Sequence, residues 1–106
     1  MEFAETKLFS RKVPTYLADD EYRELQAYML EKPDAGDVIK GSGGIRKLRW
    51  MVKGRGKRGG VRIIYYLEFT ESRFLMLTLY AKNELENLTA QEIKLLKKLV
   101  EEWNNA

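Results

Sequence analysis

The chain of 106 residues contains no cysteine and no histidine. Without cysteine there can be no disulfide bond, no cysteine-ligated iron–sulfur cluster and no thiol catalysis. Without histidine, the commonest metal ligand and the commonest proton shuttle of proteins are missing too. We therefore expect no metal and no cofactor. Any acid–base chemistry has to be carried out by lysine, tyrosine or carboxylate side chains.

Long apolar runs are missing as well. The first ten residues mix acidic, basic and apolar side chains, and no segment approaches the roughly 20 apolar residues of a membrane-spanning helix. We expect a cytoplasmic protein with no membrane partner. A chain of this length, with 44% hydrophobic and 33% charged residues, suits one hydrophobic core, so a single domain over residues 1–106 is predicted.

Positive charge is concentrated in the middle of the chain. Val38–Leu67 contains nine lysine and arginine residues and no acidic residue, and since the whole chain has a net charge of +3, the rest carries −6. A block of like charge can simply be a solvated loop. Here, however, Lys47, Arg49 and Arg62 alternate with apolar residues, which predicts that strands present them. Such segregation is typical of a site for a polyanion.

The N-terminal part of the chain predicts one strand and one helix. Phe3–Phe9 has the short, mixed pattern of an edge strand, and Pro14 interrupts the chain after it. A helix is expected from Ala18, capped by Asp19 or Asp20 and ended by the proline and glycine at positions 33 and 36. Apolar residues recur at helical spacing on one side of it: Tyr22, Leu25, Met29 and Leu30.

The remainder predicts three strands and a second helix. Segments rich in β-branched and aromatic residues indicate strands at Ile45–Val52, Val61–Phe69 and Arg73–Ala81. The short polar connection makes the last two an antiparallel hairpin. Thr89 followed by Glu92 is a capping box that begins a C-terminal helix. The predicted fold is α+β, with an antiparallel sheet of about four strands, an N-terminal helical segment and a C-terminal helix.

Strand alternation locates a candidate site, because residues two apart share a face. In the last strand, one face is expected to hold Leu75, Leu77, Leu79 and Ala81, and the other Phe74, Met76, Thr78, Tyr80 and Lys82. If the apolar faces share one core, the opposite surface gathers Lys47, Arg49, Arg62, Tyr80 and Lys82. Cations for phosphates and aromatic rings for bases are what single-stranded RNA requires.

Further RNA contacts are expected around this surface. Tyr66 is a candidate for stacking on a base, whereas Tyr65 is expected to point inward. The glycine-rich loop over residues 54–60 carries cations that could close over a nucleic-acid strand. The additional cations expected to bind RNA are Arg46, Lys53, Arg55, Lys57 and Arg58.

Three segments carry a resemblance to a known family. They are GDVIKGSGGIRKLR at 36–49, GKRGGVRIIYY at 56–66 and LYAKNE at 79–84. In order and spacing they resemble the HigB branch of the RelE toxin superfamily. The resemblance implies a compact microbial ribonuclease-like fold, cleavage of messenger RNA in the ribosomal A site, and neutralisation by a cognate antitoxin.

The resemblance also implies roles for individual positions. Lys47 and Arg49 match basic strand residues of the family site, and Arg62 matches its phosphate-binding arginine. Lys82 and Asn83 fall where further site residues follow the last strand. Asn83 departs from those RelE members that have arginine at this position. The implied partners are a helix-turn-helix antitoxin of HigA type, the ribosome and messenger RNA, with operator DNA bound only through the antitoxin.

RNA cleavage by the ribose 2′-hydroxyl needs a proton acceptor, stabilisation of the charged phosphorane and a proton donor for the leaving 5′-oxygen. Arginine stays charged, so Arg62 suits the scissile phosphate and cannot act as the base. A lysine becomes a base when neighbouring cations lower its pKa, which makes Lys47 or Lys82 the expected proton carrier. Tyr80 would stack on a base or assist proton transfer, and Glu84 is a weaker alternative base.

Two other functions fit the sequence. The basic surface could belong to a non-catalytic RNA- or DNA-binding module, in which no bond is broken. The helix expected over Thr89–Trp103 could instead be the interaction face of a structural partner protein.

Overall fold

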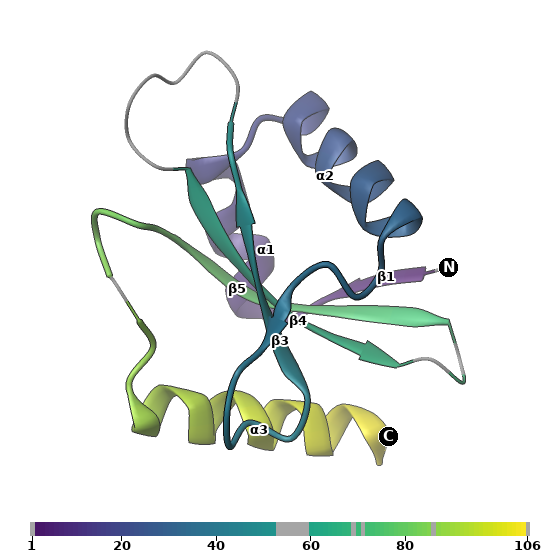
Figure 1. Ribbon diagram of the computed structural model, residues 1–106, viewed down its shortest axis with the longest axis vertical. Coiled ribbons are helices and arrows are strands. Elements are labelled where there is room, and N and C mark those ends of the chain that lie inside the picture. Colours follow the sequence, from purple (N-terminus) through teal and green to yellow (C-terminus); the bar gives the residue numbers. More distant parts are fainter. Residues whose placement is uncertain (1, 53–59, 69, 71, 86, 106) are drawn as a thin grey trace.

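The computed structural model describes residues 2–52, 60–68, 70, 72–85 and 87–105. Five strands form one mixed sheet in the order β1-β5-β4-β3-β2, with β1 parallel to β5 and the other neighbours antiparallel (Figure 1). The elements along the chain are β1 (Glu2–Glu5), α1 (Lys7–Tyr16), α2 (Asp19–Glu31), β2 (Asp37–Val38), β3 (Ile45–Trp50), β4 (Val61–Glu68), β5 (Arg73–Ala81) and α3 (Ala90–Asn104). The predicted α+β class is confirmed, but the sheet is mixed and has five strands, in place of the expected antiparallel sheet of about four.

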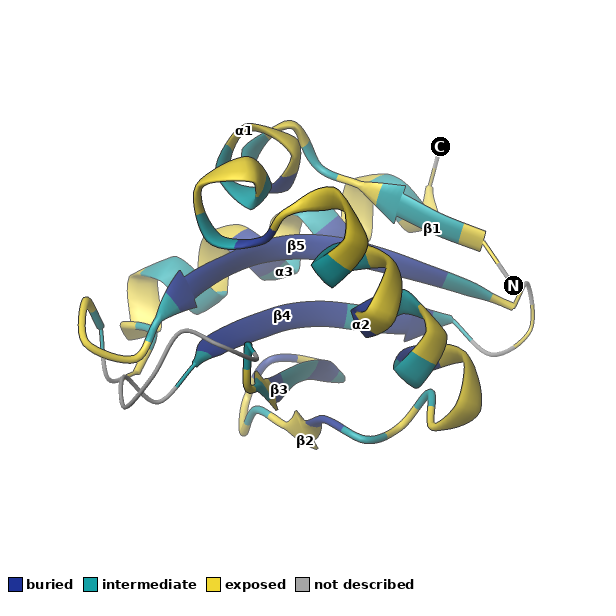
Figure 2. Cartoon of the chain, turned by 90° about the horizontal axis from the view of Figure 1, so that it is seen from above, coloured by how far each residue is buried: buried dark blue, intermediate teal, exposed yellow. Residues whose placement is uncertain are grey.

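Helices cover both faces of the sheet, and the described residues form a hydrophobic cluster on each face. Phe9 of α1 and Leu25 of α2 pack on one face together with Tyr65 of β4. Leu96 and Val100 of α3 pack on part of the other face. Because of this double cover, β4 and β5 are buried along most of their length (Figure 2). Double burial explains why these two strands read as nearly continuous apolar runs.

The N-terminal segment differs from the sequence prediction. The strand ends at Glu5, and α1 begins directly afterwards, so the expected strand over Phe3–Phe9 is wrong in its second half. The hydroxyl of Thr6 causes the change, because its Oγ1 accepts a hydrogen bond from the Phe9 N–H at 3.0 Å and caps the helix. The same hydroxyl donates to the Leu77 carbonyl of β5 at 2.7 Å. Pro14 lies inside α1, near its end, instead of preventing a helix.

The first half of β5 also departs from simple alternation. Ile64 of β4 pairs with Thr78, but Tyr65 pairs with Met76, so Leu77 is an extra residue in a β-bulge. Because of this extra residue, each side chain before Leu77 lies on the face opposite to the one that uninterrupted alternation would give it. Phe74 and Met76 therefore share a cluster with Leu79, whereas Leu75, Leu77 and Tyr80 belong to the other cluster. The expected grouping of Leu75, Leu77, Leu79 and Ala81 on a single face is wrong for this reason.

The other predicted elements are present. The first expected helix is α2, although its N-cap is Ala18, whose N–H donates to the Glu21 carboxylate at 2.7 Å, and not Asp19 or Asp20. The strand expected over Ile45–Val52 ends at Trp50, and Phe69 lies outside the described residues. The hairpin of β4 and β5 is confirmed. In the described part of the chain, no helix is both long and apolar enough to cross a membrane.

The capping box of α3 is formed as predicted. The Glu92 N–H donates to Thr89 Oγ1 at 3.1 Å, and the Thr89 N–H donates to Glu92 Oε1 at 2.8 Å. We expect Thr89→Ala to lower the free energy of unfolding by about 1 kcal/mol, because one helix N–H loses its acceptor. Urea denaturation measures this. Thr89→Ser keeps the hydroxyl and serves as the control, and equal losses in the two variants would show that the cap does not contribute.

Candidate active site

Three neighbouring strands align a row of polar side chains on the face that α3 only partly covers. Arg49 of β3 pairs with Arg62 of β4, and Arg62 pairs with Tyr80 of β5. Directly paired residues in antiparallel strands have Cβ atoms only about 5 Å apart, so the three side chains are neighbours. Lys47 lies two residues along β3, on the same face as Arg49. We call Arg49, Arg62 and Tyr80 the central row.

Arg62 is held in the middle of this row on the central strand. Only 6% of it is exposed, which is unusual for an arginine. Burying a guanidinium group costs desolvation free energy, which the interactions of Arg62 have to offset. Its burial fixes a positive charge at one place on the sheet. Such a fixed charge suits recognition of a phosphate group.

Tyr80 is the aromatic member of the row and is 4% exposed. Its hydroxyl is buried and, within the described residues, has no hydrogen-bond partner. Burial raises the pKa of Tyr80, the charge of Arg62 opposes this rise, and the Glu92 carboxylate adds to it. The phenol therefore remains protonated and can donate a hydrogen bond to a ligand.

Lys47 has two neighbours that the sequence pattern did not indicate. Its Nζ donates to Oδ1 of Asn87 at 3.1 Å, which links β3 to the connection between β5 and α3. Asp37 of β2 pairs with Lys47 and shares its face of the sheet. Strand alternation and charge pattern point to neither residue, although Asp37 lies in the segment 36–49 that carries the family resemblance. Only the strand register and the path of the connection bring them to the site.

A cavity of about 520 Å³ lies beside Lys47, where the short strand β2 meets β3. Cationic, acidic and apolar side chains contribute to its wall: Ala35, Asp37, Val38, Ile39, Lys40, Lys47, Leu48 and Arg49. The central row thus continues toward an open edge of the sheet through Arg49 and Lys47. A flexible, charged ligand could extend from one to the other.

Two predicted RNA-binding residues lie away from the central row. Arg46 is on the opposite face of β3, where its Nη1 donates to the carbonyl oxygens of Asp34 at 3.1 Å and Gly36 at 2.8 Å. The ring of Tyr66 packs against Trp103 of α3, with centroids 6.4 Å apart. Tyr66 is also four residues along β4 from the row, about 13 Å away. We do not retain Arg46 and Tyr66 as RNA ligands.

The remaining predicted residues follow β5, lie in the glycine-rich loop or directly precede it. Lys82 and Asn83 are exposed in the turn after β5, so strand register does not determine their faces. Glu84, the weaker alternative base, is already engaged, because its Oε1 accepts from the Tyr16 hydroxyl and the Ala81 N–H. These hydrogen bonds lower the pKa of Glu84, which makes it a poorer base. The other four predictions lie outside the described residues: Lys53, Arg55, Lys57 and Arg58.

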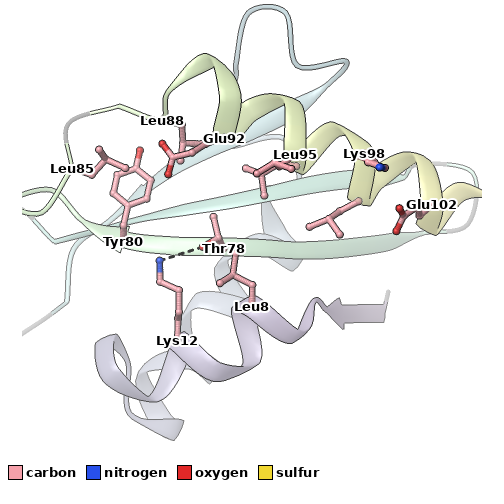
Figure 3. A pocket seen from close by; sticks show the side chains of 12 residues that line it. Leu8, Lys12, Thr78, Tyr80, Leu85, Leu88, Glu92, Leu95, Lys98 and Glu102 are labelled. Atoms are coloured by element: carbon pink, nitrogen blue, oxygen red, sulfur yellow. Dashed lines mark hydrogen bonds between the residues drawn. The ribbon is translucent and has the colours of Figure 1, made fainter.

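Tyr80 also borders a groove of about 530 Å³ between α1 and α3 (Figure 3). Leucines of α3 and of the connection before it line most of the groove, with Leu8 and Lys12 from α1. Lys12 Nζ donates to Thr78 Oγ1 of β5 at 3.4 Å. Tyr80 is therefore the member of the central row that borders this largely apolar groove. Within the described part of the chain, no three His, Cys, Asp or Glu side chains are grouped to hold a metal ion.

These features define a small α+β protein whose sheet gathers arginine, lysine and tyrosine on one face, the composition of a polyanion site. The family model for the RelE toxin of the RelE/RelB toxin-antitoxin system matches residues 6–106, and the chain belongs to the RelE toxin family. The three helices and the five-stranded mixed sheet of the described residues are consistent with the RelE fold. The chain is therefore the toxin of a type II toxin-antitoxin system and pairs with a cognate antitoxin; toxins of this family are generally ribonucleases.

Proposed function

We propose that this toxin is a metal-independent, ribosome-dependent endoribonuclease of the HigB type, which cuts messenger RNA and so inhibits translation. The observation that carries the proposal is the central row, with a buried Arg62 between Arg49 and Tyr80. A guanidinium fixed at 6% exposure is suited to stabilise charge that develops on a phosphate, because it needs little reorganisation during the reaction.

The proposed reaction begins with attack of the ribose 2′-oxygen on the adjacent phosphorus. The new bond forms as the bond to the 5′-oxygen breaks, which leaves a 2′,3′-cyclic phosphate upstream and a 5′-hydroxyl downstream. Arg62 and Arg49 stabilise the negative charge of the phosphorane. The leaving 5′-oxygen takes up one proton, and the attacking 2′-hydroxyl gives up another.

Proton transfer is assigned to the groups beside the row. Lys47 and Lys82 remain the proposed proton carriers, and the register adds Asp37, a carboxylate on the same face as Lys47. A carboxylate accepts a proton in its ordinary ionised form, whereas a lysine must first lose one. In this proposal the protonated phenol of Tyr80 donates a hydrogen bond to the reacting phosphate or stacks on a base. We retain Asn83 as a proposed RNA contact.

The family resemblance implies dependence on the ribosome, and the modest chemical equipment of this site gives a physical reason for it. A site without histidine gains most from a substrate whose 2′-oxygen and phosphorus are already aligned, and alignment alone can supply a large part of a rate acceleration. The ribosome would provide this alignment in its A site. The proposed setting is the cytoplasm, with a helix-turn-helix antitoxin of HigA type as the partner and operator DNA bound only through that antitoxin.

Induced expression in a bacterium tests the proposal. We expect growth arrest and, by primer extension, in-frame cuts in a translated reporter message. A matched reporter without its start codon should remain uncut, because its codons never enter the A site. Cuts of equal strength in both reporters would contradict ribosome dependence. Tight RNA binding by the folded protein without any cut would favour the non-catalytic binding module.

A further inference from the structure

The turn after β5 is tied to α1 by a hydrogen-bonded pair of side chains. The Tyr16 hydroxyl, at the last residue of α1, donates to Glu84 Oε1 at 2.5 Å. The same Oε1 accepts the Ala81 N–H at 3.0 Å, and the Glu84 N–H donates back to the Ala81 carbonyl at 3.0 Å. Glu84 thus closes the turn on itself and fastens it to a helix 68 residues earlier in the chain. We call the pair Tyr16 and Glu84 the clamp.

The clamp encloses the part of the chain that the proposed reaction uses. Lys82 and Asn83 lie between Ala81 and Glu84, so both are inside the closed turn. Tyr80 of the central row precedes Ala81 directly. A displacement of the turn would therefore move Lys82 and Asn83 relative to Arg62, which is fixed on β4.

The α1 end of the clamp is itself held in place. Tyr16 is partly buried and packs against the cluster between α1, α2 and the sheet. Nζ of Lys12 lies 5.9 Å from the centre of the Tyr16 ring and also donates to Thr78 of β5. The phenol therefore presents its hydroxyl from a supported position. Burial and the hydrogen bond to Glu84 raise the pKa of Tyr16 to about 12, so the phenol stays a donor at neutral pH.

A second hydrogen bond between a tyrosine and a glutamate side chain lies away from this turn. The Tyr22 hydroxyl of α2 donates to Glu5 Oε2 of β1 at 2.7 Å. Glu5 lies on the edge strand β1, which two strands separate from β3, and neither residue belongs to the turn after β5. Both pairs are solvent-accessible hydrogen bonds between a phenol and a carboxylate. The pair Tyr22 and Glu5 is therefore a matched control within the same molecule.

We propose that Tyr16 and Glu84 are positioning residues for the cleavage reaction, and that they fix Lys82 and Asn83 at the central row. This inference rests on the proposed function. Neither residue touches the reacting atoms in this assignment. Glu84 acts through its shape and its acceptor oxygen, and not as the base. An exposed hydrogen bond contributes little to stability, so the clamp can be broken without unfolding the chain.

The test is single-turnover cleavage of a labelled message on ribosomes programmed with a codon in the A site. The maximal rate and the half-saturating ribosome concentration are measured separately. We expect Tyr16→Phe to lower the maximal rate about 10- to 100-fold, because small misplacements of reacting groups cost this much. The half-saturating concentration should not change. Tyr22→Phe should cleave at the wild-type rate, although it removes an equivalent hydroxyl.

Two further variants separate positioning from proton transfer. Glu84→Gln keeps an Oε1 acceptor and should cleave nearly as fast as the wild type with the same pH profile, whereas Glu84→Ala should match Tyr16→Phe. The double variant Tyr16→Phe with Glu84→Ala should be no slower than either single variant, because both break one interaction.

Several results would overturn the inference. A wild-type rate for Tyr16→Phe, or an equal loss in Tyr22→Phe, would show that the clamp does not position the site. Loss of activity in Glu84→Gln would make Glu84 a proton-transfer group instead. Urea denaturation of Tyr16→Phe and Tyr22→Phe controls for folding. If the wild-type protein itself does not cleave, the proposed function fails, and the positioning role falls with it.

Discussion

Arg62→Ala should lower the rate of cleavage on programmed ribosomes about 100- to 1,000-fold, the usual cost of removing one group that stabilises transition-state charge. The reason is position, because Arg62 lies between Arg49 and Tyr80 on the central strand and is 6% exposed. Its guanidinium is the least adjustable positive charge of the central row. Single-turnover rates measure the effect directly, and growth after induction reports it in cells.

The chain offers a matched control in Arg46, which lies on the opposite face of β3 and bonds the carbonyl oxygens of Asp34 and Gly36. Arg46→Ala removes the same charge and should reduce stability while leaving the cleavage rate near that of the wild type. Arg62→Lys keeps the positive charge but lacks the planar guanidinium group. Its cleavage rate should therefore lie between those of the wild type and Arg62→Ala. Equal rate losses in Arg46→Ala and Arg62→Ala, with both proteins folded, would contradict a specific role for Arg62.

The largest effect on stability is expected at Phe74 of β5. This ring is 0% exposed, stacks on Phe3 at 4.8 Å between centroids and meets Tyr65 edge-on at 5.8 Å. Phe74→Ala should lower the free energy of unfolding by about 3–5 kcal/mol, since it removes buried apolar surface and leaves a cavity. Urea denaturation of purified protein gives the value.

Leu30 is the appropriate comparison, because it is a large apolar residue that is 49% exposed on α2. Leu30→Ala should change stability by only a few tenths of a kcal/mol, about the size expected for a surface substitution. If Phe74→Ala cost no more than Leu30→Ala, the packing between β1, β4 and β5 would differ from that described above.

Sequence alone predicted the elements whose signal is local. Alternation and β-branched residues located β3, β4 and β5, and the capping box located α3. The failures have non-local causes. Thr6 begins α1 partly because its hydroxyl also bonds Leu77, 71 residues away. The bulge at Leu77 arises from the pairing of two strands and cannot be seen in the alternation of β5 itself.

The candidate site likewise contains residues that could be predicted from local sequence and residues that could not. Lys47, Arg49 and Arg62 could be assigned to one face of the sheet from the alternation of side chains along a strand, because that rule depends only on residue spacing. Tyr80 lies on the predicted face in spite of the bulge. The extra residue is Leu77, so the alternation of faces after it, which includes Tyr80, is undisturbed. The neighbours supplied by other segments were not predictable, because they depend on how connections pass the sheet: Asp37, Asn87, and the clamp of Tyr16 and Glu84.

The most direct test of the central claim uses purified protein and ribosomes programmed with a message labelled at both ends. We predict one cut in the A-site codon, with a 2′,3′-cyclic phosphate on the upstream fragment and a 5′-hydroxyl on the downstream fragment. The cut should be lost in Arg62→Ala and retained in Arg46→Ala. An intact message after incubation with folded wild-type protein, or a cut that does not depend on Arg62, would contradict the claim that the central row is a ribonuclease site.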